Sequence, residues 1–166
     1  MSAPDISLLG KRRFGPIFVV QFLGAFNDNL LKFALLFLAN FGIFAGQPDK
    51  AEMLALISTG LFIAPYFLFS ALAGQLADRI DKARLVRWVK TAEVGIMLIA
   101  LAGFWTQSLP VLLTSLFLMG LHSTMFGPVK YSILPQHLRP NEIMGGTGLI
   151  EGGTFLARQR AASRPC

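Results

Sequence analysis

Two long stretches without any charged residue constrain the fold of this chain more than any other feature. Residues 53–77 and 94–129 lack Asp, Glu, Lys and Arg over 25 and 36 consecutive positions. About 20 apolar residues are enough for a helix to cross a bilayer. Only 14% of the residues are charged, against roughly 25% in an ordinary soluble domain. The sequence therefore predicts an all-α membrane protein and argues against a soluble globular domain.

Turn residues and charges divide the chain into four predicted transmembrane helices and a partial fifth. The predicted spans cover residues 16–44, 53–77, 85–105 and 109–134, and the fifth helix begins near Asn141. Trp88 and Trp105 bracket the third span, about 25 Å apart along a helix. This is the separation expected of aromatic residues at the two faces of a membrane.

The basic residues lie mostly in alternate loops. With a cytoplasmic N-terminal segment over residues 1–15, nine lysines and arginines face the cytoplasm and only Lys50 faces outward. The nine are Lys11, Arg12, Arg13, Arg79, Lys82, Arg84, Arg87, Lys90 and Arg139. Because basic loops stay on the cytoplasmic side, this asymmetry predicts a multi-pass protein with its N-terminus in the cytoplasm.

The two ends of the chain leave alternatives open. Lys11 to Arg13 followed by an apolar run is typical of a signal peptide, but no small-residue cleavage site follows, so we expect an uncleaved first helix. At the other end, residues 143–157 would cover only about 22 Å as a helix, and residues 158–166 form an atypical basic tail. We expect a truncated or frame-shifted chain; the alternative is a native four-helix protein with a cytoplasmic tail.

The sequence lacks the residue patterns of an enzyme active site or a metal site. Cys166 is the only cysteine, and no Cys/His ligand spacing or Ser/His/Asp constellation occurs. The net charge of +6 comes from residues between apolar segments and not from one basic face, so it does not indicate nucleic-acid binding. We therefore predict no catalytic residues, no cofactor and no metal.

A polar run interrupts the first predicted span near its middle. Asn27, Asp28 and Asn29 are followed by Lys32. Charges at this depth cost about 2.5 to 3.5 kcal/mol on insertion scales, so they normally face a cavity or a partner. Asp28 and Lys32 could simply neutralise each other at i and i+4 on a buried helix face. The two neighbouring asparagines favour a hydrated, substrate-facing patch.

The fourth predicted span carries Gly127, Pro128 and Lys130 close together. Proline has no N–H to donate to the carbonyl of Thr124, so a kink and an exposed backbone acceptor are expected there. Lys130 would project near this break and contact a substrate. The alternative is a lysine that extends towards the cytoplasmic interface.

The second span ends in Gly74, Asp78 and Arg79, and Lys82 and Arg84 follow. Ser70, Gly74 and Asp78 recur every four residues and so share one helix face, where small residues favour close helix packing. Asp81 is placed to cap the third helix. For Asp81, Lys82 and Arg84, the alternative is a charged loop exposed to solvent.

The loop after the second span resembles the signature loop of the major facilitator superfamily, although Asp81 stands where glycine is usual. Three further segments, residues 21–29, 127–134 and 148–151, resemble the bacterial lysophospholipid transporter family, including its version fused to an acyltransferase and acyl-carrier-protein synthetase. The resemblance covers residues 14–157. It implies a partial major facilitator domain over residues 16–157, corresponding to the first third of a twelve-helix protein.

This resemblance implies inward transport of lysophospholipids, chiefly lysophosphatidylethanolamine, across the bacterial inner membrane by alternating access. It places the first and fourth helices at matched positions of two inverted repeats, which is where a transport site is expected. We predict that Asp28 attracts the headgroup ammonium and Lys130 the phosphate, while membrane lipid surrounds the acyl chain. Gly74, Asp78 and Arg79 would form the conformational loop motif.

Two other functions fit the same residues. The chain could be the membrane module of a fused 2-acylglycerophosphoethanolamine acyltransferase, with the synthetase as partner or fusion. It could also be a small four-helix membrane assembly protein. Whatever the ancestry of the chain, we expect its 166 residues not to transport by themselves, since alternating access needs an opposing half.

Overall fold

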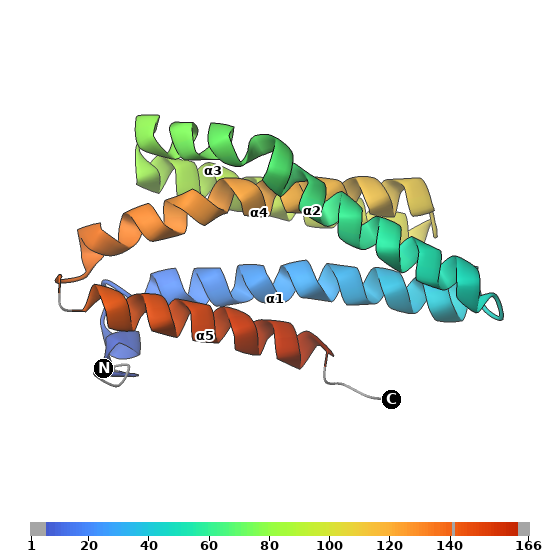
Figure 1. The fold of residues 1–166 in the computed structure, drawn as a ribbon, viewed down its shortest axis with the longest axis horizontal. Coiled ribbons are helices and arrows are strands. Elements are labelled where there is room, and N and C mark those ends of the chain that lie inside the picture. Colours follow the sequence, from blue (N-terminus) through green and yellow to red (C-terminus); the bar gives the residue numbers. More distant parts are fainter. Residues whose placement is uncertain (1–5, 141, 163–166) are drawn as a thin grey trace. The chain divides into compact units, whose positions relative to one another are not determined.

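The computed structural model describes residues 6–140 and 142–162 of the chain. In the described part, a short 3-10 helix over Ile6–Gly10 precedes five α-helices, and no strand is present (Figure 1). The α-helices are α1 (Gly15–Leu38), α2 (Pro48–Arg79), α3 (Lys82–Trp105), α4 (Leu109–His137) and α5 (Ile143–Ala162). A π-helical turn, Ala39–Ile43, extends α1. The predicted all-α membrane fold class is confirmed.

The predicted helix order agrees with the structure, and the bounds differ by a few residues. Three helices of the described part are long and apolar enough to cross a membrane: Gly15–Ile43, Pro48–Arg79 and Leu109–Pro135. The helix α3 is 24 residues long, with its charges in its first half, and its crossing of the membrane stays a prediction. The helix α5 continues through the change in composition at Arg158 and reaches Ala162.

The chain divides into two compact units, each with its own core. One unit is Leu31–Val129, and the other joins Met1–Leu30 to Lys130–Cys166. The core of the first unit contains Leu31, Leu35, Phe62, Ile96, Ala100, Leu112, Leu116 and Met119. The core of the second contains Leu8, Phe14, Leu134, Leu138 and Ile150. The helix α4 therefore supplies buried residues to both cores, whereas α1 supplies Leu31 and Leu35 to the first and packs the partly buried Ile17 and Phe18 against the second.

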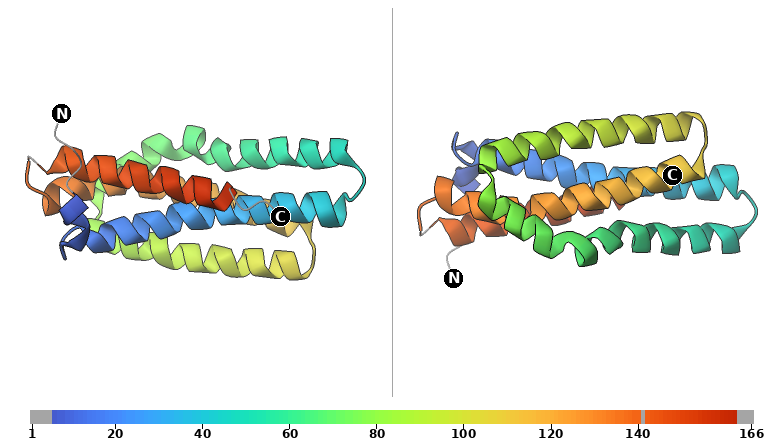
Figure 2. Two further views of the ribbon diagram at one scale, coloured as in Figure 1. Left: turned by 90° about the horizontal axis from the view of Figure 1, so that it is seen from below. Right: turned by 90° about the horizontal axis from the view of Figure 1, so that it is seen from above.

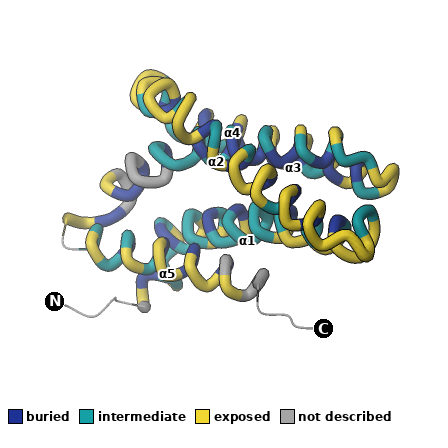
Figure 3. Tube along the Cα trace, turned by 45° about the vertical axis from the view of Figure 1, so that its right-hand side comes forward, coloured by how far each residue is buried: buried dark blue, intermediate teal, exposed yellow. Residues whose placement is uncertain are grey.

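Many large apolar side chains stay exposed, as expected for a surface that lies in lipid. Exposed residues recur along the outer faces of α2 and α3 (Figure 3). Phe67 is 84% exposed and Trp105 is 88% exposed. In water, continuous exposed apolar faces would favour aggregation. The pattern therefore supports a membrane environment for these helices.

Local sequence signals explain where the helices begin and bend. Pro48 occupies the first turn of α2, where its missing N–H costs nothing. Gly46, at φ +78°, makes the preceding turn. Asp81 caps α3 as predicted, since its side chain accepts a hydrogen bond of 2.9 Å from the N–H of Arg84. Pro65 lies inside α2, which changes direction along its length (Figure 2).

Hydroxyl and amide side chains on these helices donate to carbonyls one turn earlier in the same helix. Examples are Thr59 to Ala55, Thr114 to Pro110, Thr124 to Gly120, Thr147 to Ile143 and Thr154 to Ile150, with distances of 2.8 to 2.9 Å. Polar groups in hydrocarbon need such partners. Each of these side chains is therefore satisfied within its own helix.

Candidate functional site

The polar run predicted to bind substrate lies on α1. Asn27, Asp28 and Asn29 are all half-buried. The amide of Asn29 donates a hydrogen bond of 2.6 Å to the carbonyl of Ala25 one turn earlier. This bond uses one of the two amide hydrogens and leaves the side-chain oxygen as an acceptor. Asn29 is thus held in place by its own helix, whereas the substrate contact proposed for it remains a prediction.

Lys32 belongs to the unit Leu31–Val129 and contacts an aromatic ring of the same unit. Its ammonium nitrogen is 3.6 Å from the ring centroid of Phe62 on α2. A cation at this distance is attracted by the negative face of the ring, by about 2 kcal/mol or more where water is excluded. Phe62 was not predicted as a partner, because it lies in a charge-free apolar run that carries no sequence signal for such a role.

Lys130, the proposed phosphate ligand, lies in the helical backbone of α4. Its side chain falls outside the described residues. Residues 130–166 belong to the same compact unit as Asp28. The joint use of Asp28 and Lys130 therefore stays a prediction.

The predicted loop motif lies at the C-terminal end of α2, where Asp78 and Arg79 are exposed. The prediction of close helix packing at Gly74 is wrong for the described unit, because a Cβ added there would meet no atom within 4 Å. Close approach occurs instead at Gly120 of α4, where an added Cβ would overlap the backbone carbonyl of Phe62. Periodicity marks small residues on a face but does not say which face meets a neighbour.

Likewise, Gly148 and Gly152 of α5 have the spacing of a packing motif but open space around them. The α5 glycines in contact are Gly153, where an added Cβ would lie 2.7 Å from the ring of Phe18, and Gly146, where it would overlap the side chain of Leu138. The contact with Phe18 is thus one position away from Gly152, the residue that the four-residue spacing indicates. A turn of about 100° per residue makes such an offset enough to change the face.

A buried polar cluster connects α3 and α4. The ammonium of Lys90 lies 2.6 Å from a carboxylate oxygen of Glu93, three residues later on the same helix. The same oxygen lies 3.5 Å from Nε2 of His122 on α4. Glu93 and His122 are both buried. The His122 contact joins residues far apart in the sequence, so no local spacing identifies Glu93 as the neighbour of His122.

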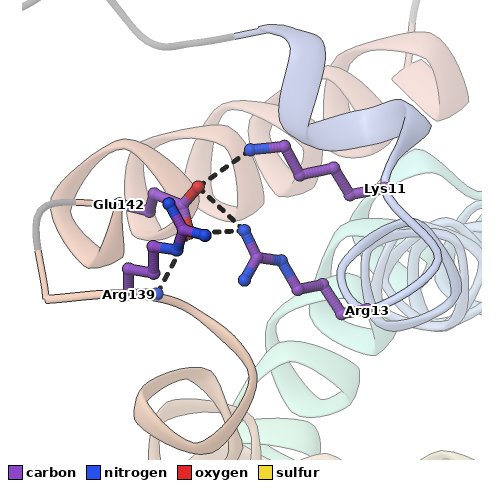
Figure 4. A network of polar contacts seen from close by, with 4 residues as sticks. All are labelled: Lys11, Arg13, Arg139 and Glu142. Carbon is purple, nitrogen blue, oxygen red and sulfur yellow. Dashed lines mark hydrogen bonds and ion pairs between the residues drawn. The ribbon is translucent and has the colours of Figure 1, made fainter.

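Glu142 organises the basic residues at one end of the second unit (Figure 4). Its carboxylate accepts hydrogen bonds from Lys11 at 2.8 Å and from Arg13 at 2.9 Å. It also accepts a bond of 3.0 Å from the backbone N–H of Arg139. These bonds, led by that from Lys11, lower the pKa of Glu142 to about 2. The three basic residues were predicted to share one side of the membrane, but their common acid was missed.

Among the described residues, no three His, Cys, Asp or Glu side chains gather in a group that could hold a metal ion.

Curated bacterial proteins that share one name match most of the chain. Lysophospholipid transporter LplT of Pectobacterium carotovorum is 29% identical over 148 residues, which is 89% of this chain and 33% of that protein. The proteins of the same name from Escherichia coli strain SE11 and Salmonella arizonae are each 30% identical over 141 residues, 85% of this chain and 32% of theirs. The chain is a homologue of the lysophospholipid transporters.

The chain spans about a third of the length of the lysophospholipid transporters that it matches. These relatives are named as transporters. No protein-family model and no solved structure matches the chain.

Proposed function

We propose that these helices form part of a transporter that carries lysophospholipids inward across the bacterial inner membrane by alternating access. The observation that carries this proposal is the 30% identity to lysophospholipid transporters over 85% of the chain. The exposed apolar faces of the helices support the membrane location. The proposed orientation, with the N-terminus in the cytoplasm, rests on the nine basic residues against one in the loops.

In the proposed mechanism, the headgroup of a zwitterionic lysophospholipid binds through both of its charges. Asp28 attracts the ammonium and Lys130 the phosphate, while the asparagines beside Asp28 offer further hydrogen bonds. Two features support a role for α1: Asp28 is half-buried near the middle of the helix, and a charge at such depth is retained at a cost of a few kcal/mol. Lys32, against Phe62, supplies a second cation beside the first unit's core.

The proposal is tested by replacing Asp28 in a full-length protein that contains these residues. We expect Asp28→Ala to abolish uptake of radiolabelled lysophosphatidylethanolamine while the amount of folded protein changes little, because the partner of the carboxylate is the substrate. Asp49→Ala is the matched control, since Asp49 is an exposed acid in the first turn of α2. It should leave uptake unchanged.

The competing explanation is that Asp28 only neutralises Lys32. Removing one member of a buried ion pair costs about 3 to 5 kcal/mol, so protein yield would fall in the single variant. If the double change Asp28→Ala with Lys32→Ala restored both yield and uptake, Asp28 would not be a substrate ligand.

A further inference from the structure

An apolar groove between α2 and α4 has the dimensions and charge of a lipid site. Its volume is about 330 Å³, and all the residues that line it belong to the unit Leu31–Val129. The lining residues are Phe69, Leu72, Gln75, Leu76 and Arg79 of α2 with Leu121 and Met125 of α4. The spacing of three and four residues places each set on one face of its helix. The groove therefore runs along the helices.

The groove has the length of one membrane leaflet. From Phe69 to Arg79 the helix α2 rises by about 15 Å, which is half of the roughly 30 Å hydrocarbon thickness of a bilayer. A water-sized group takes about 30 Å³ of liquid volume, so the groove holds about eleven such groups. A methylene is of similar size. About eleven methylenes, the larger part of one lipid acyl chain, would thus fill the groove.

The charge of the groove favours an anionic headgroup. Arg79 is the only charged residue among the lining residues, and it lies at the helix end, where a headgroup would lie. Its guanidinium can donate two parallel hydrogen bonds to a phosphate. The lining contains no carboxylate that could pair with the ammonium of a zwitterionic lipid. This distinguishes the groove from the proposed transport site, where Asp28 supplies that charge.

We propose that this groove binds one acyl chain of a resident diacyl phospholipid with an anionic headgroup, and that Arg79 pairs with its phosphate. The lipid belongs to the leaflet at the C-terminal end of α2, which the predicted topology makes the cytoplasmic one. Its acyl chain lies against Leu72, Leu76 and Met125. This site does not depend on lysophospholipid transport.

The test is direct lipid binding to the purified, delipidated chain in detergent, measured by native mass spectrometry. The probes are palmitoyl-oleoyl phosphatidylglycerol, the matching phosphatidylethanolamine and lysophosphatidylethanolamine. We expect phosphatidylglycerol to bind more tightly than either of the others. Arg79→Gln should weaken that binding about tenfold or more, since hydrogen bonds to charged groups contribute about 1.5 to 3 kcal/mol. Leu76→Trp should block the groove and weaken it without altering the charge.

Two matched controls lie outside the groove. Arg87→Gln removes an exposed arginine from α3, and Leu98→Trp adds the same ring at a position that is 62% exposed. Both should bind phosphatidylglycerol like the unmodified chain. Helical content by circular dichroism and elution volume identify any variant that fails to fold, and Met125→Trp then replaces it.

Equal phosphatidylglycerol binding by Arg79→Gln, Leu76→Trp and the unmodified chain would overturn the proposal. Tighter binding of lysophosphatidylethanolamine than of phosphatidylglycerol, lost in Leu76→Trp, would also overturn it and assign the groove to a single-chain lipid. Absence of binding by all three probes would leave another protein helix as the occupant and would equally contradict a resident lipid.

Discussion

Glu93 and Glu142 each face two basic side chains, but their surroundings give them different energetic roles. Glu93 is buried between α3 and α4, and losing its carboxylate would leave the half-buried ammonium of Lys90, 4.9 Å from the ring centroid of Phe126, without its acidic partner. Removing one partner of a buried ion pair is costly. The Glu142 side chain is about as shielded as that of Glu93, but its partners Lys11 and Arg13 are each 36% exposed, against 24% for Lys90, so solvent screens these ion pairs more and each is weak singly. Glu142 stabilises the fold through several hydrogen bonds that its one carboxylate accepts together.

The lowered pKa of Glu142 predicts how stability varies with pH. The pKa falls from an ordinary 4.5 to about 2 in the folded chain, so the ionised carboxylate stabilises the fold fully above pH 4.5. This contribution is lost as the pH falls towards 2, because the folded state must then take up the proton as well. We expect Glu142→Gln to have a lower melting temperature than the unmodified chain at pH 6.

In detergent melting experiments, the difference between Glu142→Gln and the unmodified chain should shrink as the pH is lowered from 5 to 2. Glu52→Gln, at an exposed position on α2, serves as control. If the melting temperatures of Glu142→Gln and the unmodified chain differed by the same amount across this pH range, the contacts of the carboxylate would not stabilise the fold.

Among the elements, α4 makes the tightest backbone approach identified by its glycines. Gly120 faces the carbonyl of Phe62 on α2 so closely that no side chain fits. In membranes, where lipid is as apolar as leucine, such close contacts are a main source of helix association. The close packing of α2 against α4 therefore depends on the absence of a side chain at Gly120.

We expect Gly120→Ala to destabilise the chain by about 1 to 3 kcal/mol, as overpacking of a tight contact usually does. Gly95→Ala on α3 is the matched control, because an added Cβ there meets nothing within 4 Å. That change should be neutral or stabilise by up to about 1 kcal/mol through helix propensity. Denaturation of both variants in mixed micelles compares them, and equal stabilities would contradict the proposed contact.

The helices could be predicted from the sequence because charge-free runs and turn residues are local signals. The partners of the polar residues could not. Glu142 meets Lys11 across more than 120 positions, and Phe62 meets Lys32 from within an apolar run. Gly74 and Gly148 had the right spacing, yet other glycines make the contacts. Spacing gives a face, whereas the neighbour of that face depends on the assembled fold.

For the molecule as a whole, the distribution of basic residues is the main determinant of orientation. Nine lie in loops, at the end of α2 or in the first half of α3 on one predicted side, and one lies on the other; such basic segments resist transfer across the membrane. The cluster around Glu142 keeps a net positive charge, because one acid meets Lys11 and Arg13. These contacts therefore leave the orientation signal in place.

Cysteine labelling tests this orientation in intact cells. In a background with Cys166→Ser, which removes the only cysteine of the sequence, an impermeant thiol reagent should label Asp49→Cys but not Lys82→Cys. Both positions should be labelled once the cells are opened. Labelling of Lys82→Cys alone in intact cells would reverse the topology.

The hydrogen bonds that Thr59, Thr114 and Thr154 make one turn back bear on how the chain enters the membrane during synthesis. Spans leave the insertion machinery in order, and a hydroxyl without a partner in hydrocarbon is costly. These side chains carry their acceptors with them, so each helix can partition into lipid before its neighbours exist. Lys32 differs, since Phe62 lies on the next helix to be made. The free-energy cost of placing the Lys32 ammonium in hydrocarbon is therefore reduced once Phe62 of α2 packs against it.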